Sequence, residues 1–335
     1  MLDTVAIRLP NWLGDTVMAV PAVQALRAAH PAARMLLAGP WATLLAEQGL
    51  ADVLVTYPRS WGGRLRGADA VRRFGPVLAV LLPNTLEAAV AAWYWGARRR
   101  VGFSAGARGL FLTDEVAPPE GSRPHQIDEY LLLAERAGAP AVTREPRLAP
   151  PRESSEPRRH VRDLLAEAGA SPVAGRRRVG VHLGAAFGPA KVWPTPRVAE
   201  FCRVVAADGD TAVLLGTAAE DATGAAIQRE APAASIVGRD RPDLLTAVLA
   251  EMDVLVSGDT GIAHLAAALG TPVVTLFGPT DPARSAPRGR VQVVQHPVPC
   301  SPCFYRACPI EHPCLRDIEP RRVRDHARAL AGASA

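Results

Sequence analysis

The chain has 335 residues, which at the usual domain size indicates two domains rather than one. Hydrophobic residues make up 48% of the chain and charged residues 21%, a balance that excludes an intrinsically disordered protein. The formal net charge of +5 is modest and the arginines are spread over both halves. This distribution argues against nucleic acid as a partner and suits anionic small molecules or a membrane surface.

In the first half of the chain, short apolar runs alternate with segments of helical periodicity. Residues 5–9 form an apolar run that leads into a loop and then into apolar positions at helical spacing, which predicts strand, loop and helix. Further strands are predicted at 35–38, 53–55 and 77–82, and a helix near 86–95. This alternation is typical of βαβ units in a parallel sheet.

The segment around residues 140–159 is rich in Pro, Arg, Glu and Ser and shows no apolar periodicity, which favours an interdomain linker. A second alternating series follows, with predicted strands at 179–183, 211–215, 253–257 and 272–277 and a last helix near 320–330. We therefore expect two doubly wound, Rossmann-like α/β domains that face each other across a cleft. They comprise residues 1–150 and 176–335, with a linker region at 151–175.

No segment of the sequence predicts an export signal or a membrane-spanning helix. The first 15 residues lack a basic stretch followed by an apolar core, so a cytoplasmic protein is expected. The most apolar stretch, 77–97, is interrupted by Pro83, Asn84 and Glu87 and is too broken to span a bilayer.

An aromatic cluster, Trp93-Tyr94-Trp95, stands shortly before the arginines at 98–100. Aromatic side chains beside a basic run are typical of an interfacial membrane contact. The preferred interpretation is a helix end that packs in the core and is followed by a charged turn. The membrane contact stays as the alternative.

The strongest candidate for a binding site is the turn from Ser257 to His264, where a predicted buried strand passes into a helix. Backbone N–H groups near Thr260 and Gly261 would lack partners within the helix, and together with the helix dipole they stabilise an anion. The alternative is that Asp259 or Thr260 only caps the helix. Capping explains one polar residue but not the two glycines and His264, so an anion site is favoured.

Lys191 is the one lysine among the 38 Lys and Arg residues of the chain. A chain that otherwise uses arginine is expected to keep a lysine where it needs a compact, movable ammonium rather than a planar fork. Lys191 follows a predicted strand in a loop of small residues that includes Gly188. Small residues let the backbone approach a ligand, and the ammonium can meet a diphosphate. The alternative, a solvated loop lysine, is the less favoured one here.

Asp15 lies between the first predicted strand and the first predicted helix. An aspartate in this place is most often a helix cap. A carboxylate at the carboxyl end of a strand, on the rim where doubly wound sheets bind their ligands, can also act as a general base. One rotamer does not easily serve both roles, and both interpretations remain open.

Four of the five cysteines form a C-x2-C-x4-C-x5-C cluster of Cys300, Cys303, Cys308 and Cys314. In a reducing cytoplasm such a cluster favours a metal over two disulfides, because thiolates bind zinc or iron in tetrahedral sulfur sites. We expect a structural rather than a catalytic metal, since four sulfurs close the site, and His312 could replace one cysteine. An unmetallated redox cluster and buried apolar cysteines are the alternatives.

Three segments, each of which contains a candidate residue named above, form a combined pattern. They are 8–15 (RLPNWLGD), 188–194 (GPAKVWP) and 258–264 (GDTGIAH) continuing to 276–282 (LFGPTDP). Together with the Cys-Ser-Pro-Cys-Phe segment they resemble glycosyltransferase family 9, the heptosyltransferases that add heptose to lipopolysaccharide from ADP-heptose. The likeness is greatest to the heptosyltransferase II group, and it covers nearly the whole chain.

The resemblance implies a GT-B fold and an inverting transfer without a catalytic metal or other cofactor. The N-terminal domain would hold the acceptor mainly, and the C-terminal domain the nucleotide sugar. Asp15 would take a proton from the acceptor hydroxyl as it attacks the anomeric carbon, and Lys191 would hold the diphosphate and stabilise the departing ADP. The donor would be bound by Gly188, Glu220, Asp259, Thr260, Gly261 and His264.

The implied partners are ADP-heptose as donor and a lipid-anchored core oligosaccharide as acceptor, at the cytoplasmic face of the inner membrane and with a peripheral contact to it. Two other hypotheses stay open. One is a GT-B transferase or epimerase that uses another nucleotide sugar. The other is a non-catalytic nucleotide-sugar sensor with a metal-bound module at residues 300–314.

Overall fold

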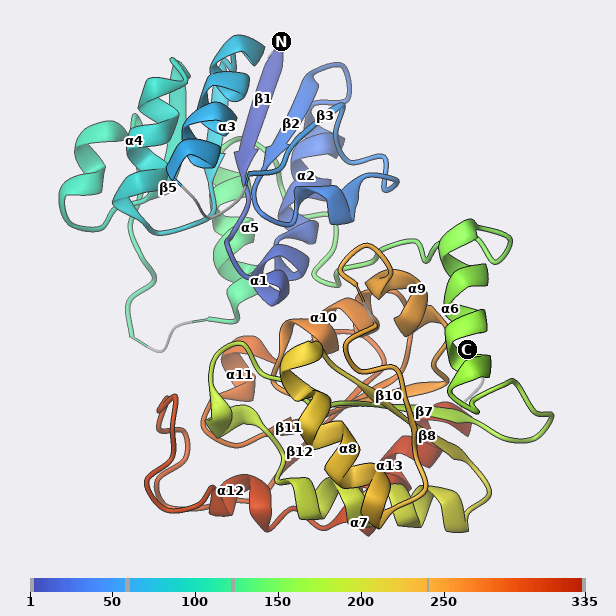
Figure 1. Ribbon diagram of the computed structural model, residues 1–335. Coiled ribbons are helices and arrows are strands. Elements are labelled where there is room, and N and C mark those ends of the chain that lie inside the picture. Colours follow the sequence, from blue (N-terminus) through green and yellow to red (C-terminus); the bar gives the residue numbers. More distant parts are fainter. Residues whose placement is uncertain (1–2, 58–60, 122–123, 240, 333–335) are drawn as a thin grey trace. The chain divides into compact units, whose positions relative to one another are not determined.

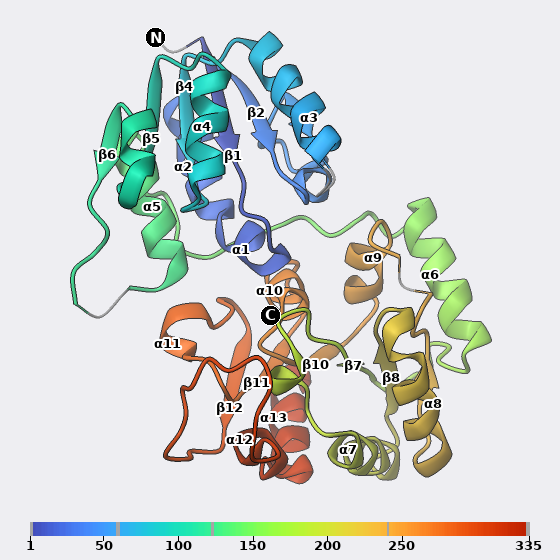
Figure 2. The same ribbon diagram turned by 60° about the vertical axis from the view of Figure 1, so that its left-hand side comes forward.

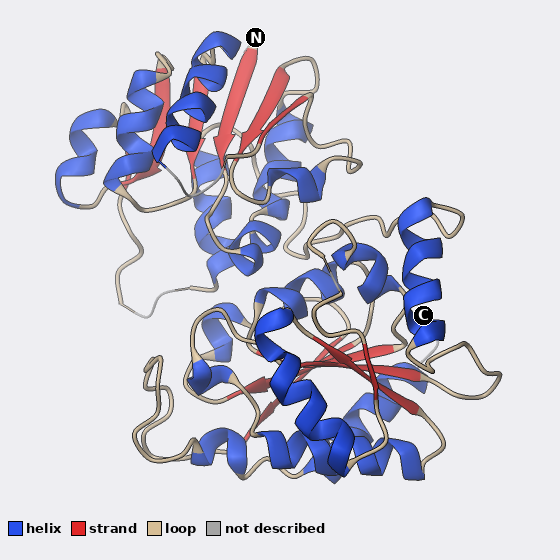
Figure 3. Ribbon diagram, in the orientation of Figure 1, coloured by secondary structure: helices blue, strands red, loops and turns tan. Residues whose placement is uncertain are grey.

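The computed structural model describes residues 3–57, 61–121, 124–239 and 241–332. The chain divides into two compact units, Met1–Leu148 (unit 1) and Ala149–Ala335 (unit 2). Each unit has a six-stranded sheet with helices on both faces (Figures 1 and 3). No helix among the described residues has the length and apolar character that crossing a membrane requires.

In unit 1 the strand order is β3-β2-β1-β4-β5-β6 and every neighbouring pair is parallel. The strands are β1 (Thr4–Arg8), β2 (Arg34–Ala38), β3 (Val53–Val55), β4 (Leu78–Leu81), β5 (Arg99–Phe103) and β6 (Asp114–Val116). The helices are α1 (Leu13–Met18), α2 (Val20–Ala29), α3 (Trp61–Phe74), α4 (Leu86–Tyr94) and α5 (Gln126–Arg136), with the 3-10 helices η1 (Ala42–Leu45) and η2 (Gly106–Phe111). Helix α2 packs against α5 and α3 against α4, and the two pairs cover opposite faces of the sheet (Figure 2).

Unit 2 repeats this architecture with the order β12-β11-β10-β7-β8-β9, again with parallel neighbours. Its strands are β7 (Arg178–His182), β8 (Thr211–Leu215), β9 (Ala234–Ser235), β10 (Val254–Gly258), β11 (Val273–Phe277) and β12 (Val291–Gln295). Its helices are α6 (Glu156–Glu167), α7 (Thr195–Ala207), α8 (Asp221–Glu230), α9 (Leu245–Ala250), α10 (Gly261–Ala268), α11 (Pro282–Ser285), α12 (Pro313–Arg316) and α13 (Pro320–Gly332), with η3 (Pro189–Lys191) and η4 (Ala218–Glu220). Helices α7 and α13 lie on one face of the sheet and α9 and α10 on the other (Figure 1).

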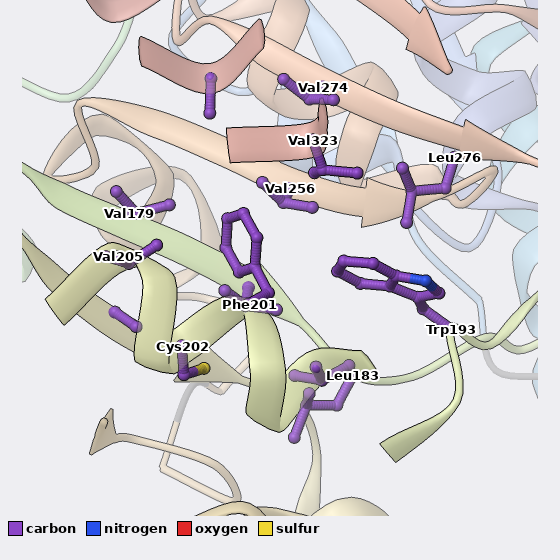
Figure 4. Close-up of a cluster of buried hydrophobic side chains, with 14 of the residues drawn as sticks. Val179, Leu183, Trp193, Phe201, Cys202, Val205, Val256, Val274, Leu276 and Val323 are labelled. Carbon is purple, nitrogen blue, oxygen red and sulfur yellow. The ribbon is translucent and has the colours of Figure 1, made fainter. Parts of the chain in front are cut away.

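The core of unit 2 lies between its sheet and helices α7 and α13. Phe201 of α7 is fully buried among the valines of β7 and β10, and Val323 of α13 packs on the same cluster (Figure 4). Trp193 meets Phe201 edge to face, with ring centroids 5.8 Å apart at 60°. Because Trp193 directly follows the loop that carries Lys191, this packing fixes one end of that loop to the core.

The predicted fold class, two doubly wound Rossmann-like units, is confirmed. The charged turn predicted at 98–100 is wrong, because Arg99 and Arg100 begin β5. Arg99 Nη2 donates to Asp114 Oδ1 at 3.0 Å and Arg100 Nε donates to the Phe111 carbonyl at 2.6 Å. Local partners of this kind let charged residues occupy a strand.

The region predicted as a linker, 151–175, contains helix α6. Val161 and Leu165 of this helix are fully buried, and Arg158 donates to Glu251 at 2.7 Å. Since Glu251 follows α9, the ion pair attaches α6 to unit 2. The boundaries of the two domains stay a prediction.

Both sheets have the same switch point, where the strand order reverses: between β1 and β4 in unit 1 and between β7 and β10 in unit 2. Open α/β sheets bind ligands outside the carboxyl ends of the strands at this point. In unit 1 the loop after β1 leads to Asp15. In unit 2 the loop after β7 leads to Lys191, and β10 leads into the turn at Asp259 and Thr260.

Candidate functional site

An ion pair between Lys191 and Asp259 lies at the centre of the candidate site in unit 2. Lys191 Nζ donates to Asp259 Oδ2, and the same oxygen accepts a hydrogen bond from Thr280 Oγ1 at 2.6 Å. The Lys191 side chain is 11% exposed and that of Asp259 is 6% exposed. The alternative of a solvated lysine is therefore wrong, and the ammonium is held beside the start of α10.

The glycines of these loops make room for the protein's own backbone. A Cβ at Gly258 would collide with the Lys191 carbonyl oxygen. Gly188 has φ +147°, which favours glycine, and a Cβ there would lie 2.5 Å from the Arg306 carbonyl oxygen. Both glycines therefore allow close contacts within the protein, and the prediction that Gly188 lets the backbone approach a ligand stays a prediction.

The turn before α10 is built differently from a simple capped helix. Thr260 occupies the N-cap position with extended backbone, but its side chain makes no capping bond. Its Oγ1 lies 2.9 Å from Ser257 Oγ instead. Thr260 therefore leaves the first-turn N–H groups of α10 uncapped by its side chain, as an anion site requires. His264, one turn further on, is buried.

Glu220 lies near the beginning of the loop that carries Lys191. Its Oε2 accepts hydrogen bonds from the Thr217 backbone N at 2.8 Å and from Thr217 Oγ1 at 2.7 Å. A Cβ at Gly184 would lie 3.0 Å from Glu220 Oε1, so the carboxylate rests on the backbone just after β7. Glu220 thus lies at the edge of the sheet where β7 ends, the edge at which a ligand is expected. Its interactions within the protein are those of a capping box.

His182, the last residue of β7, adds a titratable group to this edge. Burial lowers the pKa of His182 to about 4, opposed by the negative charge of Glu220. His182 Nδ1 and Trp193 Nε1 are both buried without a hydrogen-bond partner among the described residues. They line one small pocket together with Ser257 and Gly258. A neutral imidazole therefore borders the pocket at neutral pH.

We expect His182 to make unit 2 less stable in acid. Its folded pKa of about 4 lies below the value of about 6.5 in an unfolded chain, so the unfolded chain binds more protons and stability rises with pH. Between about pH 7.5 and pH 5 the loss is about 2 kcal/mol. Urea unfolding of wild type and His182→Gln at both pH values measures this loss of unfolding free energy. His160→Gln, at an exposed position of α6, is the control, and equal pH slopes in all three proteins would contradict the assignment.

In unit 1, Asp15 is the third residue of α1 and not its N-cap. The N-cap is Trp12, whose side chain makes no capping bond. The interpretation of Asp15 as the helix cap is therefore wrong. Helix α1 packs against α5, where burial, with the negative charges of Asp15 and Glu129 as smaller causes, raises the pKa of Tyr130.

A buried arginine beside Asp15's loop was missed by the sequence analysis. Arg8, at the end of β1, is 1% exposed, and its Nη2 donates to Asn11 Oδ1 at 2.9 Å and lies 3.6 Å from Glu87 Oε2. Its guanidinium carbon lies 5.0 Å from the ring centroid of Tyr57, whose pKa burial raises to about 12. The sequence did contain a signal for this residue. Arg8 is charged and ends a predicted buried strand, and a buried charge needs partners.

The cysteine cluster does not form a metal site in this structure. Among the described residues, which include all of 300–314, no three His, Cys, Asp or Glu side chains are placed to hold a metal. Cys314 is buried, Cys300 is exposed, and Cys308 Sγ accepts a hydrogen bond from the His312 backbone N at 3.3 Å. Burial and the nearby thiols, Cys303 included, raise the pKa of Cys314. The residues do not fit the predicted zinc or iron, and we assign no step to a metal.

Two Rossmann-like units with the same strand order, each with polar loops at its switch point, are the architecture of the GT-B fold. Residues 70–313 match the family described as Glycosyltransferase family 9 (heptosyltransferase). The chain belongs to this family, and the prediction that it is an enzyme of this kind is confirmed.

Several relatives match over nearly their whole length. Lipopolysaccharide heptosyltransferase 2 of Escherichia coli strain K12 is 26% identical over 344 residues, covering 96% of each chain. The solved structure of E. coli ADP-heptose lps heptosyltransferase II superposes with a TM-score of 0.79 at 24% identity, covering 98% of each chain. A glycosyl transferase family 9 structure from Veillonella parvula superposes with a TM-score of 0.87 at 19% identity, covering 100% of this chain and 99% of that one. The fold predicted from the resemblance is thereby confirmed.

Proposed function

We propose that this enzyme transfers heptose from ADP-heptose to the core oligosaccharide of lipopolysaccharide with inversion at the anomeric carbon. The observation that carries the proposal is the Lys191–Asp259 pair at the switch point of unit 2, beside the start of α10, where the N-cap residue Thr260 makes no side-chain capping bond. An ammonium and a helix N-terminus at one place suit a diphosphate. The E. coli relatives supply the choice of ADP-heptose and lipopolysaccharide.

Unit 2 binds the donor in this proposal. The Lys191 ammonium has three N–H donors, of which one is directed at Asp259. The others meet the diphosphate oxygens, where negative charge grows as the bond from phosphate to the anomeric carbon breaks. Asp259 and Thr280 keep the ammonium in place. The remaining donor contacts are assigned to Gly188, Glu220, Thr260, Gly261 and His264.

Unit 1 binds the acceptor and supplies the base. Asp15 accepts the proton of the acceptor hydroxyl while that oxygen forms a bond to the anomeric carbon, and ADP departs with the bonding electron pair from the opposite side. Attack from the side opposite the leaving group inverts the configuration. Asp15 lies in the first turn of α1, the helix that follows β1, and is not the N-cap of that helix.

The test uses the purified full-length chain with ADP-heptose and a panel of truncated core acceptors. Mass spectrometry is expected to find an acceptor that gains one heptose, and NMR of the product should give the inverted anomeric configuration. Transfer from a different nucleotide sugar, or an epimerised sugar, would replace the proposed donor or reaction. Binding of ADP-heptose without turnover on any acceptor would support the sensor hypothesis instead.

A surface on α4 suits the proposed contact with the cytoplasmic face of the inner membrane. Leu86, Val90 and Trp93 follow one another at helical spacing and are 49%, 37% and 58% exposed. Leu110 on the adjoining η2 is 85% exposed. Trp95, in contrast, is buried, so the aromatic cluster divides between the core and this surface. We propose that the surface contacts the membrane in which the lipid-anchored acceptor lies.

Vesicle binding tests this contact. The double change of Leu86 and Trp93 to Gln is expected to weaken binding to vesicles with anionic lipid about tenfold, because about 1.4 kcal/mol of apolar burial is lost. Val142→Gln removes an exposed apolar side chain elsewhere in unit 1 and serves as the control. Equal vesicle binding of the two variants and wild type would contradict a membrane contact at α4.

A further inference from the structure

We infer that the cysteine-rich segment acts as a brace for the Lys191–Asp259 pair, with Arg306 as the positioning residue for Lys191. The inference rests on the proposed donor-binding role of Lys191 and adds a function for residues 300–306, which the metal hypothesis leaves unexplained. It is carried by the contacts that these residues make on both sides of the ion pair.

On the Lys191 side, Arg306 holds the loop at two points. Its Nε donates to the Phe187 carbonyl oxygen at 2.7 Å, and its own carbonyl oxygen accepts from the Ala190 backbone N at 3.1 Å. Gly188 lies between these points and has no room for a side chain against the Arg306 backbone. Arg306 therefore determines the course of the three residues that precede Lys191.

The ring of Phe187 extends this hold to the ammonium itself. Lys191 Nζ lies 4.7 Å from the centroid of the Phe187 ring, and the guanidinium carbon of Arg306 lies 5.6 Å from the same centroid. Both distances are within the range of cation–π attraction. One aromatic ring thus contacts both cations, and Arg306 can orient Lys191 through Phe187 without touching it.

On the Asp259 side, the same segment holds the loop after β11. Phe304 donates its backbone N–H to the Pro279 carbonyl at 2.8 Å, and Ser301 Oγ donates to the Gly278 carbonyl. Thr280, which follows Pro279, donates a hydrogen bond to Asp259. Residues 301–306 consequently contact the loop that carries Lys191 and the loop that carries Thr280, the residue that donates to Asp259.

The backbone of the segment is strained in a way that fits this role. Phe304, Glu311 and His312 are the non-glycine residues with positive φ in the described part of the chain, at 58°, 59° and 52°. Such conformations persist where surrounding contacts over-determine them, and they concentrate at functional sites. Phe304 itself makes the contact to Pro279, two residues before Arg306, so one strained residue lies at one of the two points that the segment connects.

The chain offers an unusually direct probe, because Lys191 is its one lysine. Feeding carbon-13 lysine to cells that express the chain without a lysine-containing tag gives a single lysine spin system. We expect the ring of Phe187 to shift the Hε resonance of Lys191 away from the chemical shift of a free lysine. In Arg306→Ala this chemical shift should return toward the free value. Arg316→Ala removes an exposed arginine of the neighbouring α12, whose side chain pairs with Asp317 and not with this loop, and should leave the signal unchanged.

Steady-state kinetics of the Arg306 variants test whether this contact matters for transfer. Arg306→Ala is expected to lower kcat/KM for ADP-heptose about tenfold with KM for the acceptor unchanged. Arg306→Lys should recover only part of this kcat/KM, since it keeps the charge but lacks the Nε–H that donates to the Phe187 carbonyl. In a Lys191→Ala background, Arg306→Ala should have no further effect.

The outcomes separate the two proposals. If Lys191→Ala impairs transfer while Arg306→Ala behaves like wild type, or if Arg306→Ala has the same effect in both backgrounds, the bracing role is wrong and the donor role of Lys191 stands. If Lys191→Ala leaves transfer and ADP binding intact, the donor role is wrong and the bracing inference is overturned with it.

Discussion

Replacing Lys191 by Ala is expected to lower turnover about 10³-fold, because removing one donor that stabilises developing charge costs about that much. ADP binding, measured by calorimetry, should weaken as well, since the diphosphate carries its charge before the reaction. Lys191→Arg should recover binding more than turnover, because a planar guanidinium keeps the charge but cannot occupy the place of the ammonium beside Asp259.

A second change separates catalysis from stability. In Lys191→Ala the Asp259 carboxylate, 6% exposed, loses its cation, and breaking a buried pair in this way costs about 3–5 kcal/mol. The double variant Lys191→Met with Asp259→Asn removes both charges and should recover most of the stability in urea unfolding, with Thr280 still able to donate to the amide oxygen. Recovery of transfer in this double variant would refute the catalytic assignment of Lys191.

The fold was predictable because its signals are local. Predicted strands at 53–55 and 211–215 coincide with β3 and β8. Strands β6 and β12 were missed, and so were two strands with weak local signals: β5 begins with two arginines, and β9 has only two residues. Both depend on pairing with β4 and β8, which a local pattern does not contain.

The candidate site was predictable in its loops and not in its contacts. The turn at Ser257 to His264 and the loop of Lys191 follow strands, so their place at the sheet edge follows from topology. The partner that holds the Lys191 loop, Arg306, is 119 residues from Phe187 in sequence, and no spacing rule connects them. Cysteine spacing indicated a metal, but spacing alone does not determine whether the backbone brings the sulfurs together.

Replacing Asp15 by Ala is the second change with a large expected effect. Transfer should fall about 10³-fold, within the range that a general base contributes. Affinity for ADP should stay close to that of wild type, because the donor contacts are assigned to unit 2. Rates with the best acceptor from the product assay, together with ADP calorimetry, measure the two quantities separately.

Asp128 supplies a matched control for this experiment. It is the third residue of α5, as Asp15 is the third residue of α1, and it lies in the same unit. Both carboxylates interact favourably with the positive end of their helix dipole, and Asp128 also pairs with the exposed Arg144, so both alanine variants should lose a small amount of stability. If Asp128→Ala slowed transfer as much as Asp15→Ala, the effect would come from the helix and not from proton transfer. A normal rate in Asp128→Ala and a slow one in Asp15→Ala, with ADP affinity retained in both, assigns the loss to the carboxylate after β1.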